Sequence, residues 1–436
     1  MKEILNLLRS QASRTLLYTK ALGKWALVSG IAGILCGLLG SAFHLGVDWA
    51  NELRLANPWL IWLLPVAGLA ITGIYAFFSV EGQSTNSIIS EVQSGKGLKL
   101  TLIPSIFLST LLTHLVGGSA GREGAALQMG GTIGFEVGKL LHLDDRDLRT
   151  ATLAGMAAFF SALFGAPLAA TIFAMAVISV GLIYHSALIP CLLASLTAYG
   201  VSSLFHIIPM HFSVAVPNVS LGMLLRVAVL GALCGFVALL FCDTLHLFER
   251  KMERFFSNPS VRAAVGGTGL LVLSLLFPSG DYNGAGGAVI VRAIEEGQAQ
   301  PFAFLLKILF TSVTLSAGFK GGEVIPCFFI GACFGCTMGP LLGIPAGFAA
   351  AVGLISVFCG AVNCPIASTF LAVELFGSPG LLYYALACAL SFVLSGYTGL
   401  YSSQRILYDK LKAQYIDVHA NAHHEGEHTP MEEKYH

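Results

Sequence analysis

Charged residues are scarce in this chain, and that scarcity excludes most soluble classes of protein. Asp, Glu, Lys and Arg make up only 11% of the 436 residues, whereas 55% of the residues are hydrophobic. A soluble domain carries about 25% charged residues, which its solvated surface requires. The high apolar content also excludes intrinsic disorder. The 24 basic and 24 acidic residues balance, so the charge gives no support to nucleic-acid binding.

Long stretches of the sequence contain no charge at all. No Asp, Glu, Lys or Arg occurs from Thr150 to Leu225, a run of 76 residues, or from Val324 to Val373, a run of 50. Because about 20 apolar residues span a bilayer as a helix, the sequence predicts an all-α polytopic membrane protein. The candidate spans are 25–50, 58–80, 99–117, 123–141, 147–164, 167–183, 185–206, 220–249, 260–277, 302–317, 324–341, 345–361, 365–376 and 379–397. Shorter helices are expected over 84–95, 285–296 and 402–414.

The two ends of the chain predict its orientation. Basic residues spaced among apolar ones over 1–24 indicate an amphipathic helix on the cytoplasmic face. Arg405, Lys410 and Lys412 follow the last long apolar segment, so both termini are expected in the cytoplasm. Residues 415–436, which are rich in histidine, are expected to form a disordered cytoplasmic tail.

Nothing in the sequence favours a cofactor, a metal centre or an enzyme. The pair Cys333 and Cys336 lies among Gly331, Gly335 and Gly339, a pattern that favours close helix packing over metal or redox chemistry. No cluster of His, Asp and Glu and no recognisable Ser-His-acid set lies in the uncharged segments. The prediction is therefore a protein with no enzymatic activity, no cofactor and no metal site.

Two short motifs recur at nearly the same separation. Ser-Ala-Gly at 119–121 recurs at 316–318, and Ala-Pro-Leu-Ala-Ala-Thr at 166–171 is matched by Cys-Pro-Ile-Ala-Ser-Thr at 364–369. The chain therefore has two homologous halves, which we expect to be 25–208 and 220–414, with a linker over 209–219. Interrupted helices at matching positions of two halves point to a binding site between them.

Gly-rich turns within the buried stretches open helices at 82–87, 117–126 and 321–326. The free N–H groups and positive dipole of such a helix start form an anion site, and glycine lets the backbone approach a ligand. Glu123 begins the second of these helices. Its carboxylate competes with an anion for the same donors, and a buried carboxylate also accepts protons. It can thus act as a gate; the alternative is a helix-start glutamate paired with Arg122.

These features resemble the CLC family of chloride channels and proton-coupled anion exchangers. The resemblance rests on Gly121-Arg122-Glu123-Gly124, the turn from Gly322 to Pro326, the repeated halves and Tyr401, and it covers residues 25–412. It implies two inverted-topology halves with broken, re-entrant helices, forming a homodimer in a bacterial inner (plasma) membrane. By the same resemblance Glu123 is the gating glutamate, and the anion-binding residues are Ser84, Gly124, Val324, Ile325 and Tyr401.

The sequence departs from the family pattern at two places. The family's serine turn reads Gly-Ser-Gly-x-Pro, whereas this chain has Gly-Gln-Ser-Thr-Asn at 82–86. A strict count gives Gln83 the serine position, and Ser84 is the nearest hydroxyl. Chloride exchangers often carry an internal glutamate where this chain has Ala176 and Val177, so that intracellular proton relay is absent.

The missing glutamate and Gly-Gly-Glu-Val at 321–324 resemble the fluoride/proton-exchanging branch. In that branch Glu323 would be a second proton-handling carboxylate; the alternative is a helix-start residue facing a vestibule. That branch typically has Met in the serine turn and Thr at the position of Ile325, and this chain has neither. Because selectivity depends on the dipoles around the ion, we expect chloride to be carried at least as fast as fluoride.

The leading hypothesis is a halide/proton exchanger gated by Glu123, whose partners are chloride or fluoride ions, protons and the lipid bilayer. The runner-up is a passive voltage- or pH-gated chloride channel. A membrane-embedded enzyme and a non-transporting scaffold are further alternatives. Several other residues are given less specific roles. Arg122 is expected to pair with a loop carboxylate or carbonyl, and His114 to be hydrogen-bonded in the core. Glu374 is expected to serve in proton relay, helix packing or the dimer interface. A short charged loop, either solvated or at a helix N-cap, is expected from Asp144, Asp145, Arg146, Asp147 and Arg149.

Overall fold

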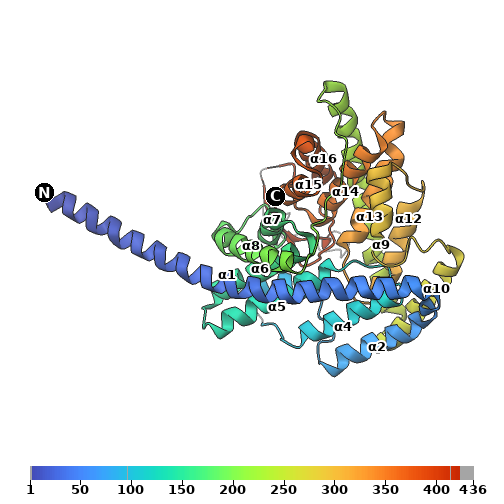
Figure 1. Cartoon of the computed structure of the whole chain (residues 1–436), viewed down its shortest axis with the longest axis horizontal. Helices are drawn as coiled ribbons and strands as arrows, with labels where there is room; N and C mark the ends of the chain where they lie inside the picture. Colours follow the sequence, from blue (N-terminus) through green and yellow to red (C-terminus); the bar gives the residue numbers. More distant parts are fainter. Residues whose placement is uncertain (1, 96, 413, 423–436) are drawn as a thin grey trace, which may run out of the picture.

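Almost all regular structure in this chain is helical (Figure 1). The computed structural model describes residues 2–95, 97–412 and 414–422. The helices of the first half are α1 (Lys2–Ala56), α2 (Leu64–Phe77), α3 (Thr85–Ser94), α4 (Leu102–Leu115), α5 (Glu123–Leu140), α6 (Asp145–Phe164), α7 (Pro167–Ala176) and α8 (Leu188–Leu204). Those of the second half are α9 (Leu221–Phe255), α10 (Pro259–Leu276), α11 (Gly287–Val291), α12 (Ala303–Ser316), α13 (Val324–Leu341), α14 (Ala346–Val362), α15 (Pro365–Phe376) and α16 (Leu381–Leu394). Short 3-10 or π turns occur at Pro58–Leu63, His185–Ala187, Arg292–Glu296 and Ser378–Gly380.

Only some of these helices are long enough to cross a bilayer alone. Among the described residues, six helical segments have sufficient length and apolar character, and six further apolar helices are shorter. Short helices at membrane depth must end inside the protein or at a cavity, because lipid cannot satisfy their terminal N–H and C=O groups. Residues 205–220 form no helix and separate α8 from α9, at the place of the expected linker. The chain thus has the broken-helix architecture that the sequence predicts.

The N-terminal region differs from its prediction. Residues 2–24 are not a separate helix, because α1 continues from Lys2 to Ala56 without a break. The N-terminal part of α1 extends away from the helical body (Figure 1). No proline interrupts this segment, so the backbone hydrogen-bond ladder has no reason to end at the first span. Near the point where α1 joins the body, Lys24 forms an ion pair with Asp147 of α6.

The α5–α6 pair of the first half has its counterpart in the α13–α14 pair of the second half. In each pair, glycines let the helix backbones touch. A Cβ atom added to Gly155 would lie 2.0 Å from the carbonyl oxygen of Gly130, and one added to Gly353 would lie 2.2 Å from that of Gly331. Small residues allow this close approach in membrane helices. The N-termini of α5 and α13 thus belong to two closely packed helix pairs.

The C-terminal segment forms strands, which the sequence analysis did not predict. Residues 402–414 were expected to be helical, and residues 415–436 were expected to be disordered. Instead β2 (Arg405–Tyr408) pairs in parallel with β1 (Ser179–Val180) and antiparallel with β3 (Tyr415–His419). Ile406 is fully buried in this sheet, and Arg405 pairs with Asp417 at 2.5 Å. These contacts between segments outweigh the weak local preference of 402–414 for a helix. Residues 423–436 of the expected tail lie outside the described residues.

Two of the residues expected to be structural act at helix N-termini. Asp144 accepts hydrogen bonds from the N–H groups of Arg146 and Asp147 at 3.0 and 2.9 Å. These bonds, that from Asp147 first, hold the pKa of the Asp144 carboxyl below its usual value. The carboxylate of Glu374 accepts from the N–H groups of Leu168 and Ala169, at 3.0 and 2.8 Å. Glu374 therefore caps α7 from the second half, which is a helix-packing role.

Candidate functional site

The two repeated turns meet directly. Gly121 and Gly322 exchange a pair of backbone hydrogen bonds, with N···O distances of 2.7 and 2.8 Å. Each glycine lies just before the helix that its turn opens, α5 and α13 respectively. The N-termini of these helices are therefore brought together at the junction of the two halves. Their free N–H groups concentrate positive potential there, as an anion site requires.

Glu123 extends from the start of α5 to the start of α13. The residue is 0% exposed, and its Oε2 accepts a hydrogen bond from the backbone N–H of Ile325 at 3.3 Å. Its Oε1 has no partner among the described residues. The carboxylate thus occupies a helix N-terminus of the opposite half, a position that favours negative charge. This geometry brings together three of the residues predicted for the site, because Val324 is buried beside Ile325.

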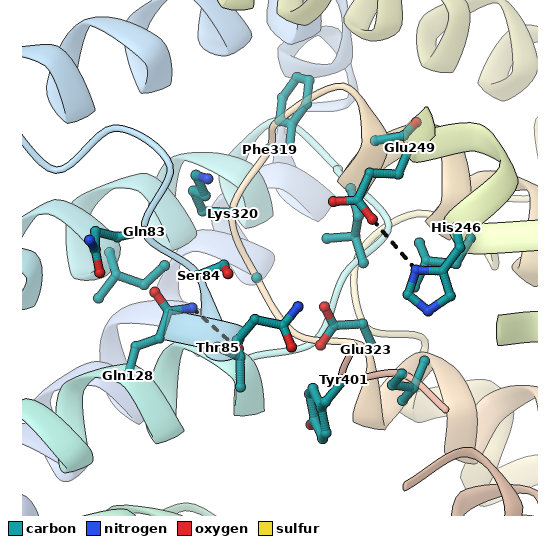
Figure 2. A pocket seen from close by; sticks show the side chains of 17 residues that line it. Gln83, Ser84, Thr85, Gln128, His246, Glu249, Phe319, Lys320, Glu323 and Tyr401 are labelled. Carbon is teal, nitrogen blue, oxygen red and sulfur yellow. Dashed lines mark hydrogen bonds and ion pairs between the residues drawn. The ribbon is translucent and has the colours of Figure 1, made fainter. Parts of the chain in front are cut away.

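Two cavities lie near Glu123. The first, which we call the Arg122 cavity, has a volume of about 370 Å³, and its lining includes Asp48, His114, Arg122 and Ile325. The second, the Tyr401 cavity, has a volume of about 140 Å³ (Figure 2). Its lining includes Gln83, Ser84, Thr85, Gln128, His246, Glu249, Lys320, Glu323 and Tyr401. Glu123 lines neither cavity but adjoins residues of both. Its Oε2 accepts from Ile325, which lines the Arg122 cavity, and its neighbour Gly124 accepts from Thr85, which lines the Tyr401 cavity.

The wall of the Tyr401 cavity contains two polar residues that the sequence analysis missed. Thr85 Oγ1 donates to the carbonyl of Gly124 at 3.5 Å. Gln128 Nε2 donates to Thr85 Oγ1 at 3.4 Å (Figure 2). Thr85 is thus the hydroxyl of the 82–87 turn that contacts α5. Ser84, which was predicted, also lines the cavity, and its N–H donates to Ser87 Oγ at the start of α3. The sequence did hold a signal for Gln128, because it is a single polar residue in the run of small and apolar residues that follows Glu123 in α5.

Tyr401 and Glu323 lie next to one another on the cavity wall (Figure 2). Tyr401 is 2% exposed, and its hydroxyl has no partner among the described residues. Glu323 stands at the N-cap position of α13 without a side-chain capping bond, and its Oε2 is also without a partner in the described part of the chain. A free phenol hydroxyl donates to anions and a free carboxyl oxygen accepts protons. The wall of the cavity therefore includes a phenol and a carboxylate, each with a buried oxygen that lacks a hydrogen-bond partner among the described residues.

Two residues beside the turn that carries Glu123 are hydrogen-bonded, although the carboxylate that Arg122 contacts lies on a helix and not in a loop as expected. Arg122 Nη1 donates to Asp48 Oδ1 of α1 at 3.2 Å. His114 is fully buried, and its Nε2 lies 3.3 Å from the carbonyl oxygen of Gly121. Both contacts fix the turn that carries Glu123.

Comparison with known proteins identifies the family. The sequence model described as voltage gated chloride channel matches residues 67–396. A chloride/fluoride channel protein of Pseudomonas syringae pv. tomato is 35% identical over 400 residues, covering 89% of this chain and 88% of that protein. This chain belongs to the CLC family. A CLC-type fluoride/proton antiporter structure has a TM-score of 0.85 at 34% identity, covering 88% of this chain and 98% of that one. An H⁺/Cl⁻ exchange transporter of Vibrio parahaemolyticus is 25% identical over 391 residues, covering 80% of this chain and 81% of that protein.

The position of the internal glutamate of CLC chloride exchangers is apolar here. Ala176 is the last residue of α7, and Val177, which follows it, is fully buried. The carbonyl of Val177 accepts a hydrogen bond from Gln404 Nε2 at 2.9 Å. No titratable side chain is therefore offered at this point of α7.

We expect Tyr401→Phe to lower halide affinity about tenfold, because a hydrogen bond to a charged group contributes about 1.5–3 kcal/mol. Tyr397→Phe is the matched control, since the Tyr397 hydroxyl donates instead to Asp409, outside the cavity. Titration calorimetry with halide measures both affinities. Equal affinities for wild type and Tyr401→Phe would show that the hydroxyl does not contact the anion.

Proposed function

We propose that this CLC protein exchanges a halide for protons across the membrane, with Glu123 as the gate. The observation that carries the proposal is the position of its carboxylate, which accepts the N–H of Ile325 between two cavities. While ionised it holds that donor against an incoming anion. When protonated it loses most of its attraction to the helix N-terminus and leaves the donor to a halide.

Each predicted residue has a distinct part in this proposal. The N–H groups of Gly124, Val324 and Ile325 belong to the starts of α5 and α13, so they supply backbone donors to the anion. Ser84 and Tyr401 supply hydroxyl groups from the wall of the Tyr401 cavity. Glu323 is the second carboxylate and holds a proton at the cavity. Thr85 and Gln128 extend the polar wall toward Gly124.

A passive chloride channel is the alternative function, and flux in proteoliposomes distinguishes the two. An exchanger uses a halide gradient to drive protons uphill, whereas a channel lets the halide run down its own gradient without moving protons. The test is purified protein in liposomes with an imposed chloride or fluoride gradient and a pH-sensitive dye. Proton movement against its gradient supports exchange, and halide flux without it supports the channel.

A fluoride-selective exchanger is a second candidate, favoured by the similarity to the fluoride/proton antiporter structure and by Glu323. Two differences from the fluoride/proton branch argue against it. The Tyr401 cavity has the hydroxyls of Ser84 and Thr85 in the turn where that branch has a methionine. Ile325 has no side-chain hydroxyl, whereas that branch has a threonine at this position. We therefore expect chloride flux to equal or exceed fluoride flux, and the double variant Ser84→Met with Ile325→Thr to shift the ratio toward fluoride. A wild-type ratio favouring fluoride about tenfold, or about 1.4 kcal/mol in barrier height, would support the second candidate.

The proposal includes the location and assembly of the protein. It is an integral membrane protein, and we place it in the bacterial inner membrane with both termini in the cytoplasm. Arg14 and Lys20 are exposed near the start of α1, as the positive-inside rule favours.

We further propose a homodimer. The neighbouring helices α7 and α15 expose Leu168, Ile366 and Phe370 at 46%, 50% and 41%, an apolar surface available to a second copy or to lipid.

A further inference from the structure

A third carboxylate, Glu249 of α9, lines the Tyr401 cavity together with Glu323 (Figure 2). Its side chain is 56% exposed, whereas Glu123 is 0% exposed. Glu249 therefore contacts both the surrounding solvent and the cavity that extends to Glu323. Since Val177 replaces an acid at the end of α7, Glu249 is the described carboxylate best placed to receive protons at this side of the cavity.

Glu249 is paired with His246, one helical turn earlier on α9. The carboxylate Oε2 lies 3.6 Å from Nδ1 of the imidazole. The other ring nitrogen, Nε2, lies 2.9 Å from the carbonyl oxygen of Gly399 and 3.1 Å from Nδ2 of Asn421. The carbonyl oxygen can only accept a hydrogen bond, and the amide nitrogen can only donate one.

Nε2 of His246 therefore has a partner in either charge state of the ring. The imidazolium donates from Nε2 to Gly399 and from Nδ1 toward Glu249. The neutral ring keeps its proton on Nδ1, facing Glu249, and accepts at Nε2 from Asn421. A group that gains and loses protons repeatedly needs such satisfaction in both states, because an unpartnered buried nitrogen is costly. An ion pair with a purely structural role needs only one of the two partners of Nε2, the carbonyl of Gly399 or the amide of Asn421.

Several charged groups surround the His246–Glu249 pair. Lys320 lines the cavity beside it, and Arg262 of α10 and Arg250 of α9 act on it electrostatically. Arg262 is itself bound to Glu253 at 3.0 Å, one turn further along α9. Glu323 faces the pair across the cavity, and its Oε2 has no partner among the described residues. Glu323 is thus the carboxylate that the pair faces within this cavity.

Resting on the proposed halide/proton exchange, we propose that Glu249, paired with His246, takes protons from solution and passes them to Glu323 through the Tyr401 cavity. A cavity of about 140 Å³ has room for about four water molecules at about 30 Å³ each. One proton passes from a hydronium ion in solution to the carboxylate of Glu249, leaving a water molecule. It then crosses the cavity water to the carboxylate of Glu323, and Glu249 is ionised again. Only O–H bonds form and break, and Glu323 then holds the proton for Glu123.

The test compares Glu249→Gln with wild type in proteoliposomes, recording halide flux and proton flux in the same vesicles. We expect the proton flux to fall about tenfold while halide flux stays within about twofold, so that the number of halides moved per proton rises. Glu249→Asp keeps an acid at this position and should retain coupling. Glu52→Gln is the control, because Glu52 of α1 is exposed but does not line the cavity. Its two fluxes should equal those of wild type.

Three other outcomes overturn the inference. Unchanged proton flux in Glu249→Gln shows that protons take another route. Proton and halide fluxes that fall in the same proportion show that the pair only supports the structure around Tyr401. Coupling lost equally in Glu249→Gln and Glu249→Asp shows that the acid itself is not what matters. Absence of proton flux in the wild type is a separate result, which contradicts the proposed exchange rather than the role of Glu249.

Discussion

Glu123→Gln is expected to lower proton flux by about a hundredfold or more, because the amide cannot carry the proton that the carboxylate carries. The amide oxygen can still accept the N–H of Ile325, as Oε2 of Glu123 does at 3.3 Å. A neutral group is held less strongly at a helix N-terminus than a carboxylate. Halide flux in this variant then reports whether the neutral side chain still excludes the anion from that donor.

The measurement is proton uptake driven by a halide gradient, with halide release recorded in parallel. Glu136→Gln is the matched control, because Glu136 belongs to the same helix, α5, but lies near its other end and lines neither cavity beside Glu123. It should transport as wild type does. If Glu123→Gln moved protons at the wild-type ratio to halide, Glu123 would not be the gate.

Gly322→Ala is expected to lower both fluxes about tenfold or more. A Cβ atom at this position would lie 2.5 Å from the nitrogen of Gly124, 2.7 Å from the nitrogen of Glu123 and 2.8 Å from Glu123 Oε2. Two of these neighbours are backbone atoms and cannot rotate away. Such overpacking typically costs about 1–3 kcal/mol, and about 1.4 kcal/mol in a transport barrier is a factor of ten. The junction of the two repeated turns therefore requires glycine for its close approach.

Gly73→Ala separates this effect from a general intolerance of alanine. A Cβ atom at Gly73, within α2, would meet nothing within 4 Å. Alanine is favoured over glycine inside a helix by about 1 kcal/mol, so this variant should fold and transport normally. Size-exclusion profiles of both variants show whether Gly322→Ala is folded. Wild-type fluxes in a folded Gly322→Ala would mean that the two turns can separate without affecting the anion path.

The helices were predictable because their signals are local. The segments expected at 324–341 and 365–376 are α13 and α15 with the same bounds, since a charged Gly-rich turn begins the first and a proline the second. The repeated motifs likewise predicted the positions of the two glycine-rich turns that precede α5 and α13. Glu123, Glu323, Ser84, Ile325 and Tyr401 could be selected from motif and resemblance alone, because each stands at or beside a helix start or a turn.

Where the sequence analysis failed, the deciding contacts join distant segments. The helix expected at 402–414 is instead β2, because Arg405 and Ile406 pair with Ser179 and Val180 more than 200 positions earlier. Thr85 was not selected over Ser84, because only the packing of α3 against α5 places its hydroxyl at Gly124. The hydrophobic periodicity of a segment does not specify which distant segment it will contact.

By itself the sequence determined that the chain is a polytopic membrane protein of two repeated halves, with a carboxylate at a glycine-rich helix start. Those properties follow from hydrophobic runs, glycine and proline positions and the order of charges, all of which act locally. Only the tertiary structure decided that Glu123 reaches the N–H of Ile325 in the other half, and that Glu249 and His246 share a cavity with Glu323. A hydrogen-bond donor 202 positions away becomes a neighbour only when the two halves pack, and no pattern within either half specifies that distance.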